Sequence, residues 1–158
     1  MRLRDEKVVN RSAVIVRPMV ASDVSEAYSI LKESPEASVW SMESLLESVS
    51  QGEIWVAEMD GHLAGILIGR VAADEFEILN LAVGREFRRR GVATQLVRAA
   101  LESARITGAQ KAYLEVRATN EGGIQFYHRL RFQICGRRPN YYRDPVEDAV
   151  LLAYTAAE

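Results

Sequence analysis

The sequence predicts an α+β fold with a mixed, mostly antiparallel central sheet of about seven strands, flanked by about four helices. The chain has 158 residues, of which 48% are hydrophobic and 27% charged, as is typical of one globular domain. Asp60-Gly61 lies between two β-branched and aromatic segments and predicts a tight hairpin. A helical apolar stripe that begins at Val92 is followed by a strand pattern. Hairpins therefore come first and βαβ elements follow, which excludes a doubly wound parallel sheet.

The N-terminal part is expected to contain an extension, one strand and two helices. Residues 1–12 are highly charged and are expected to precede a single domain over residues 13–158. A strand over Ala13–Arg17 stops at Pro18, which has no N–H for a sheet. Side chains suited to helix N-caps then predict two helices, one from Ser22 or Asp23 to about Glu33 and a short one from Ser41.

The rest of the domain is expected to alternate strands with two more helices. The helix from Val92 has apolar residues at steps of 4, 1, 3, 1 and 3, and Gly108 ends it. A further helix is expected over residues 120–130. The remaining strands are expected over residues 53–59, 62–72, 75–83, 111–117, 132–137 and 147–155.

Composition and charge exclude several classes of protein. The single cysteine, Cys135, cannot form an internal disulfide, and no cluster of cysteine and histidine predicts a metal site. No segment approaches the roughly 20 apolar residues of a membrane span. The start lacks the apolar run of a signal peptide, so a cytoplasmic protein without nucleic-acid or membrane partners is expected.

Charge is distributed unevenly along the chain. Residues 1–79 carry 14 acidic and 7 basic residues, whereas residues 80–158 carry 8 and 13. Of the 20 basic residues 17 are arginine, whose planar fork binds two phosphate oxygens at once. Two interpretations remain open: a genome that prefers arginine codons, or a C-terminal half that receives an anionic ligand. The acidic N-terminal half suits a cationic ligand.

Three segments are candidates for function. The first, Phe87–Thr94, lies where a strand meets a helix, and its Gly91 permits close approach of a ligand to the backbone. Three arginines precede this glycine, so the segment is either a phosphate-binding helix start or a solvated cap. The second is Glu115, a carboxylate in the middle of a strand. Glu115 is either a general base in a cleft or an exposed partner of Arg117.

The third candidate segment is the helix over residues 120–130. Tyr127 either fills the core or points its phenol into a cleft, while the neighbouring His128 is expected at the surface. Gly122 and Gly123 each cost about 1 kcal/mol in a helix interior, which indicates that something packs closely at this helix start.

Taken together, these segments resemble the GNAT superfamily of N-acetyltransferases, over about residues 13–155. In that superfamily's acetyl-CoA signature, the three defining positions correspond to Arg88, Gly91 and Ala93. The chain is also similar to the RimI branch, which acetylates the N-terminal α-amine of a small-subunit ribosomal protein. The segments that carry the resemblance are Trp40-Ser41, Leu81-Ala82-Val83, Arg88 to Ala93, Leu114 to Asn120, Phe126-Tyr127 and Asn140-Tyr141-Tyr142.

The resemblance implies a reaction and a role for each matching residue. It implies acetyl transfer from acetyl-CoA to a protein N-terminus, with Glu115 as proton acceptor, Tyr127 as proton donor and no metal. It implies an acceptor entrance at Trp40, Tyr141 and Tyr142. The residues implied to hold acetyl-CoA are Leu81, Ala82, Val83, Arg88, Arg89, Arg90, Gly91, Val92, Ala93, Thr94 and Asn120. A small-molecule amine acetyltransferase and a CoA-sensing module without chemistry remain as alternatives.

One departure from the family pattern concerns the end of the helix over residues 120–130. The family has glycine where this chain has Arg131. That glycine suits a left-handed helix end, so Arg131 either costs of order 1 kcal/mol there or the helix ends differently.

Overall fold

The structure is a computed structural model, and it describes residues 13–34, 37, 40–51 and 53–156. The extension expected over residues 1–12 lies outside this range. The described residues form seven strands and four α-helices, in the order expected from the sequence, so the predicted fold class is confirmed. The elements are β1 (Ile15–Pro18), α1 (Val24–Glu33), α2 (Met42–Val49), β2 (Ile54–Met59), β3 (His62–Ala72), β4 (Glu75–Val83), α3 (Val92–Ile106), β5 (Lys111–Arg117), α4 (Glu121–Arg129), β6 (Gln133–Tyr142) and β7 (Glu147–Thr155), with single 3-10 turns at Ala21–Asp23 and Arg85–Phe87.

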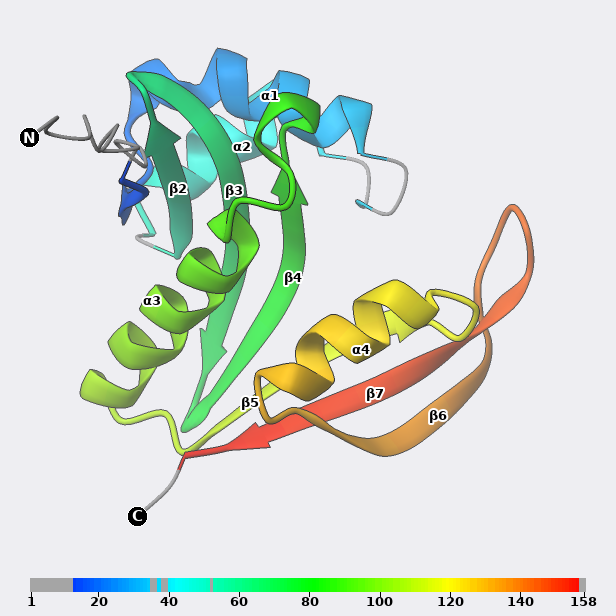
Figure 1. Ribbon diagram of the computed structural model, residues 1–158. Helices are drawn as coiled ribbons and strands as arrows, with labels where there is room; N and C mark the ends of the chain where they lie inside the picture. Colours follow the sequence, from blue (N-terminus) through cyan, green and yellow to red (C-terminus); the bar gives the residue numbers. More distant parts are fainter. Residues whose placement is uncertain (1–12, 35–36, 38–39, 52, 157–158) are drawn as a thin grey trace, which may run out of the picture.

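The molecule has three layers, with helices on both faces of one sheet. The sheet has the order β1-β2-β3-β4-β5-β7-β6. Helices α3 and α4 cover one face, and α1 and α2 cover the other (Figure 1). Each face has its own apolar core, one under α3 and α4 and one under α1 and α2. Among the described helices, none is both long enough and apolar enough to cross a membrane.

Strands β4 and β5 pair over only part of their length. They are parallel and in register from Glu75 opposite Lys111 to Ile78 opposite Leu114. Beyond this point β4 continues to Val83 and β5 to Arg117, and the two strands separate, as Figure 1 shows. The sheet is therefore open in its middle, on the side toward which both strands run.

A β-bulge in β4 lies where the two strands separate. Ile68 of β3 pairs with Asn80, but the next residue, Gly69, pairs with Ile78. Leu79 is therefore an extra residue on β4, and the side chains that follow it exchange faces.

The bulge has a visible effect on the two cores. Before it, Phe76 and Ile78 belong to the core under α3 and α4. After it, Leu81 and Val83 pack against that core, while Ala82 belongs to the core under α1 and α2. The bulge thus turns Leu81 and Val83 toward the opening between β4 and β5.

Most of the expected boundaries are confirmed, and one is wrong. The hairpin between β2 and β3 turns at Asp60 and Gly61, both with positive φ (+53° and +76°), as the Asp-Gly pair predicts. Strand β6 does not end at Arg137 but runs to Tyr142, which still pairs with Glu147 of β7. The prediction failed because the pairing there is irregular and its residues are mostly exposed, so the sequence shows no apolar alternation.

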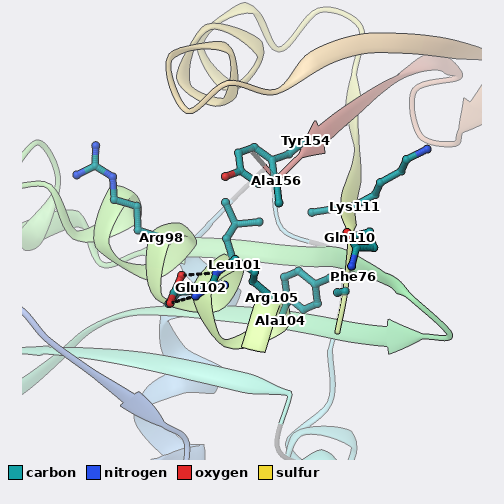
Figure 2. A pocket seen from close by; sticks show the side chains of 12 residues that line it. Phe76, Arg98, Leu101, Glu102, Ala104, Arg105, Gln110, Lys111, Tyr154 and Ala156 are labelled. Atoms are coloured by element: carbon teal, nitrogen blue, oxygen red, sulfur yellow. Dashed lines mark hydrogen bonds and ion pairs between the residues drawn. The ribbon is translucent and has the colours of Figure 1, made fainter. Parts of the chain in front are cut away.

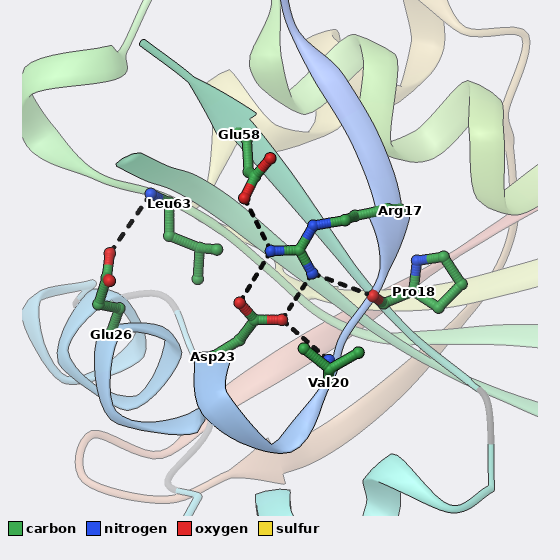
Figure 3. Close-up of polar contacts among 7 residues, drawn as sticks. All are labelled: Arg17, Pro18, Val20, Asp23, Glu26, Glu58 and Leu63. Carbon is green, nitrogen blue, oxygen red and sulfur yellow. Dashed lines mark hydrogen bonds and ion pairs between the residues drawn. The ribbon is translucent and has the colours of Figure 1, made fainter. Parts of the chain in front are cut away.

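An ion-pair network joins β1, β2 and the start of α1 (Figure 3). Arg17 donates to both carboxylate oxygens of Asp23 at 2.7 and 2.9 Å and to Glu58 at 2.8 Å. Asp23 also accepts the Val20 N–H at 2.8 Å. Asp23 is at the expected N-cap position of α1, but its side chain makes no cap bond to the helix. Instead, its carboxylate fastens the turn before α1 to the edge of the sheet.

Helix α4 ends in a left-handed residue, as one of the two alternatives predicted. Arg131 has φ of +71°. Its N–H donates to the His128 carbonyl, and the Phe132 N–H donates to the Tyr127 carbonyl, both at 3.0 Å. This pair of bonds is a Schellman motif. The rings of Tyr127 and Phe132 meet edge to face at 5.3 Å, which supplies the apolar contact that accompanies the motif.

Candidate functional site

A cavity of about 220 Å³ lies in the opening between β4 and β5. Side chains from both strands, from the first turn of α3 and from α4 line it. Six of the residues singled out from the sequence are among them: Leu81, Val83, Ala93, Glu115, Asn120 and Tyr127. Residues from three separate parts of the chain are therefore brought to one space.

Tyr127 reaches this cavity from α4, and its ring is almost completely buried. It packs edge to face against Phe126 at 5.0 Å and against Phe132. Burial raises the pKa of the Tyr127 phenol well above its ordinary value of 10.0. The phenol is thus a neutral group that retains its proton at physiological pH. The neighbouring His128 is exposed, as expected.

Glu115 reaches the cavity from the middle of β5, where its side chain is 17% exposed. Its carboxylate oxygen Oε1 lies 3.3 Å from Nε of Arg138 on β6. The Tyr141 phenol lies beside the same carboxylate, and its interaction with Glu115 is the main reason why the pKa of Tyr141 is raised. Glu115 is therefore a half-buried carboxylate with two donors beside it.

The alternative of an ion pair between Glu115 and Arg117 is wrong. Arg117 donates to Glu147 at 3.2 Å, and its guanidinium lies over the ring of Tyr142, 4.5 Å from the centroid. The same Glu147 carboxylate accepts the Thr119 N–H at 2.7 Å. Arg117 and Glu147 thus hold the end of β5 to the start of β7, which leaves Glu115 to face the cavity.

Asn120 caps α4 and is held closely by Gly123. Its Oδ1 accepts the Gly123 N–H at 2.9 Å. A Cβ atom on Gly123 would lie 2.6 Å from Asn120 Nδ2, whereas one on Gly122 would meet nothing within 4 Å. The close packing that the glycine pair predicted is therefore present at Gly123 and not at Gly122.

The N-terminus of α3 is the second part of the site. Its N-cap residue, Gly91, has φ of +80° and no side chain to cap the first turn. The first N–H to bond back within the helix is that of Gln95, which donates to the Gly91 carbonyl at 3.1 Å. The N–H groups of Val92, Ala93 and Thr94 thus point out of the helix end, where the helix dipole is positive.

The three arginines before Gly91 surround this helix end. Arg88 Nε lies 3.4 Å from the Val83 carbonyl, and an Arg90 nitrogen lies 3.7 Å from Met59 Sδ. Arg89 is exposed and has a left-handed backbone, with φ of +62°. Open N–H groups, a positive dipole and three guanidinium groups together fit the phosphates of a bound anion.

Two of the residues expected at the cofactor site have side chains directed elsewhere. Val92 is buried in the core under α3 and α4, and Ala82 is buried in the core under α1 and α2. Only their backbone groups are available to a ligand between β4 and β5.

A second cavity, of about 360 Å³, adjoins the first. Both are lined by Glu115 and Asn120. Trp40, Tyr141 and Tyr142, the three residues expected at an acceptor entrance, all line the second cavity. Burial and nearby carboxylates raise the pKa of Tyr142 to about 12, so this wall is aromatic and uncharged.

Two residues of the site were missed by the sequence reasoning. Asn80 is a buried polar residue that lines both cavities, and its place within the apolar run of β4 was a signal that could have been used. Arg138 gave no such signal. It lies 23 positions after Glu115, in an edge strand rich in charge, and only the pairing of β6 with β7 brings it to Glu115.

The largest cavity described, about 370 Å³, lies at the other end of α3 (Figure 2). Its walls include Phe76, Leu101 and Tyr154, and Glu102 and Arg105 pair with each other at its edge. These residues are not among those expected at the site, so size alone does not identify the functional cavity.

Comparisons with known proteins agree with this geometry. The Acetyltransferase (GNAT) family model matches residues 18–132. A ribosomal protein bS18-alanine N-acetyltransferase of Salmonella typhimurium is 31% identical over 137 residues, which are 84% of this chain and 90% of that protein.

Two solved structures are similar to nearly the whole chain. The ribosomal-protein-S18-alanine N-acetyltransferase of Escherichia coli has a TM-score of 0.81 at 28% identity, covering 92% of this chain and 96% of that one. Ard1 of Thermoplasma volcanium has a TM-score of 0.83 at 28% identity, covering 92% and 99%. The family model covers well over half of the sequence, and the fold has the strand opening that holds the candidate residues. This chain is an N-acetyltransferase of the GNAT family.

Proposed function

We propose that this enzyme transfers the acetyl group of acetyl-CoA to the N-terminal α-amine of a protein, with a terminal alanine of a small-subunit ribosomal protein as the expected acceptor. One observation carries the proposal. Glu115 and Tyr127, from different elements, line one cavity beside the first turn of α3, and Glu115 also lines the adjoining cavity of Trp40, Tyr141 and Tyr142. A thioester that enters beside α3 and an amine that enters past Tyr141 and Tyr142 would meet there.

In this proposal the α3 end binds the acetyl-CoA substrate. The N–H groups of Val92 to Thr94, with Arg88 to Arg90, would hold the pyrophosphate. Asn120 would bind the pantetheine arm, and a backbone N–H near Val83 would polarise the thioester carbonyl. The fit is supported by the glycine N-cap, because a side chain cap would occupy the same donors.

The proton transfers fall to the two titratable groups in the cavity. Glu115 would accept the proton that leaves the amine, directly or through a water molecule. The neutral amine nitrogen would then form a bond to the acetyl carbon, and the bond from that carbon to sulfur would break. The second proton of the nitrogen would leave by way of Glu115 once this residue has passed the first to solvent. Tyr127 would give its proton to the leaving thiolate and regain one from solvent. The products are an N-acetyl peptide and CoA. The buried, protonated state of Tyr127 supports the second role.

The acceptor is argued from amine chemistry and from the relatives. An α-amine has a pKa of about 7.7–8.0 and a lysine side chain about 10.4. At a given pH, neutralising lysine is therefore costlier by about 3.4 kcal/mol, so one carboxylate is a sufficient base for an α-amine. The relatives at about 30% identity are named ribosomal protein bS18-alanine N-acetyltransferases, which supports a ribosomal-protein alanine as the acceptor here.

An acceptor panel tests the proposal. Purified enzyme and acetyl-CoA are given peptides with a free N-terminal alanine, serine or methionine. Matched peptides are blocked at the N-terminus and carry an internal lysine, and a set of small amines completes the panel. Release of the CoA thiol is measured. Turnover of the free peptides but not of the blocked ones is expected.

Each other result has a definite meaning. Turnover of small amines alone would replace the protein acceptor with a small-molecule one. Tight acetyl-CoA binding without turnover of any amine in the panel would overturn the proposed acceptor class and favour a CoA-sensing role.

A further inference from the structure

The candidate base Glu115 already has a cation beside it in the substrate-free enzyme. We propose that Arg138 competes with the acceptor for Glu115, because its guanidinium occupies the place on this carboxylate that the acceptor's ammonium group must take. The acceptor then displaces Arg138 on binding, and the pair forms again after the neutral acetylated product leaves. This inference rests on the proposed role of Glu115 toward an amine.

The geometry shows that Arg138 approaches Glu115 from outside the site. The Glu115 side chain is 17% exposed, whereas that of Arg138 is 56% exposed. The Arg138 guanidinium also lies over the Tyr141 ring, 5.6 Å from its centroid, and Tyr141 lines the 360 Å³ cavity beside Glu115. Arg138 and Tyr141 thus cover Glu115 together, as two side chains of β6 on one carboxylate.

The backbone of β6 makes this covering possible. Pairing with β7 is interrupted between Arg138 and Tyr142, and Asn140 within the interruption has φ of +52°. The Asn140 N–H donates to Asp148 at 2.9 Å, which fixes the irregular segment to β7. In a regular strand, residues 138 and 141 would point to opposite faces, but here both reach Glu115.

Arg138 lies on a different cavity from the one at the proposed acceptor entrance, and Glu115 lines both. The cavity of Arg138 has a volume of about 310 Å³ and is also lined by Glu75, Glu77 and Tyr113. Glu115 and Glu77 also line the 360 Å³ cavity at the acceptor entrance, whereas Arg138 lines the 310 Å³ cavity and not that one.

Displacement is easy because Arg138 is mostly in water. Exposed ion pairs contribute up to about 1 kcal/mol, which corresponds to a factor of about 5 in affinity. An acceptor with a protonated amine must break this pair in order to bind, so it loses up to this factor in affinity, whereas a neutral amide does not compete for the carboxylate. Arg138 therefore sets the affinity for charged acceptors without closing the site to them.

Equilibrium binding of two peptides tests this inference. One peptide has a free N-terminal alanine and the other is its N-acetylated form, and both are titrated at about pH 6.5, where the α-amine is protonated. The proteins are wild type, Arg138→Met and Arg138→Lys. The control is Arg137→Met, because Arg137 is the preceding residue of β6, is similarly exposed and pairs with Asp148 rather than Glu115.

Arg138→Met is expected to bind the free peptide about 2–5-fold more tightly and the acetylated peptide as wild type does. Arg138→Lys keeps the competing cation and should stay near wild type, and Arg137→Met should change neither affinity. Unchanged or weaker binding of the free peptide by Arg138→Met overturns the inference. Arg138 would then only hold the Glu115 carboxylate in position.

Turnover separates this inference from the proposed function. If wild type binds the free peptide, Arg138→Met binds it more tightly, and neither acetylates it, the proposed acceptor is wrong and the competition for Glu115 stands. If wild type acetylates the peptide and the affinities of the variants are equal, the function stands and the competition is wrong.

Discussion

Gly123 and Asn120 are mutually dependent: the amide of Gly123 is capped by Asn120, and the absence of a side chain on Gly123 leaves room for that cap. The cap bond is 2.9 Å long, and a Cβ atom on Gly123 would lie 2.6 Å from Asn120 Nδ2. Since Asn120 also lines both cavities of the site, a glycine that costs helix stability is used to place a polar side chain.

Alanine at these two glycines is expected to have opposite consequences. Gly122→Ala meets open space and should stabilise the protein by about 0.5–1 kcal/mol without changing the KM for acetyl-CoA. Gly123→Ala should displace Asn120, lose a cap contribution of about 1 kcal/mol that cancels the gain in helix propensity, and raise that KM. Thermal unfolding and steady-state kinetics measure both effects. Equal KM values for the two variants would remove Asn120 from acetyl-CoA binding.

Glu115→Gln is expected to preserve the shape of the cavity and to remove the carboxylate that is proposed as the base. Acetyl-CoA affinity should change little, because the proposed pyrophosphate site is at α3, while kcat falls by about 100-fold or more. Titration calorimetry with acetyl-CoA and release of CoA thiol measure the two quantities. Glu75→Gln, at an exposed carboxylate of the neighbouring cavity, is the matched control. Full turnover by Glu115→Gln would show that another group takes the proton.

Tyr127→Phe is expected to remove the proton donor while keeping the ring contacts with Phe126 and Phe132. The kcat should fall by about 100-fold, with stability nearly unchanged. Because burial raises the pKa of Tyr127, the phenol stays protonated, and wild-type kcat should show no alkaline fall from this group below about pH 10. Tyr154→Phe, at the distant cavity of Figure 2, is the control. A loss of activity with a midpoint near pH 8 that vanishes in Tyr127→Phe would contradict the assigned state.

Asp23→Asn is expected to destabilise the protein in a pH-dependent way. Hydrogen bonding from Arg17 lowers the pKa of Asp23 below its ordinary value of 3.8, so the carboxylate contributes stability above that pH and loses it as the pH falls through the folded-state pKa. Wild type should exceed the variant by about 1–3 kcal/mol at pH 7, and the difference should shrink below about pH 4. Denaturant unfolding at several pH values measures it.

A matched control for Asp23→Asn is Glu102→Gln, which breaks a fully exposed pair with Arg105 and should have little effect. A difference between wild type and Asp23→Asn that does not depend on pH would show that packing, not charge, holds the turn before α1.

Arg131→Gly is expected to stabilise the protein, since glycine adopts the left-handed conformation of this helix end without strain. The gain should be about 1 kcal/mol, or about 2–4 °C in Tm for a chain of this length. Thermal unfolding measures it. A lower Tm would show that the Arg131 side chain makes a contribution larger than its backbone strain.

The elements that depend on local sequence pattern could be predicted from the sequence. The Asp60-Gly61 turn, the alternation along β5 and the apolar stripe of α3 each follow from contacts between residues close in the chain, and their bounds agree with the structure. The left-handed end of α4 at Arg131 was one of two alternatives, because a helix end depends on backbone geometry as well as on residue type.

Three features of the site depended on pairing between distant segments. The bulge at Leu79 is a mismatch between β3 and β4, so no window of β4 alone reveals it. The separation of β4 from β5 after Ile78 is likewise a property of two strands. The neighbour of Glu115 was expected to be Arg117 and is Arg138, since the true partner comes from β6 across the sheet.

By itself, the sequence determined the order of the elements and the glycine start of α3, because residue type and short spacing dictate these. It left two interpretations each for Glu115 and Tyr127, and only the resemblance to the GNAT superfamily implied a base and an acid. The tertiary structure alone decided that Glu115 and Tyr127 share one cavity, that Asn120 depends on Gly123, and that Arg138 pairs with the Glu115 carboxylate. The physical reason is that contacts across a sheet are set by strand register and by bulges, and one extra residue exchanges the faces of every side chain that follows.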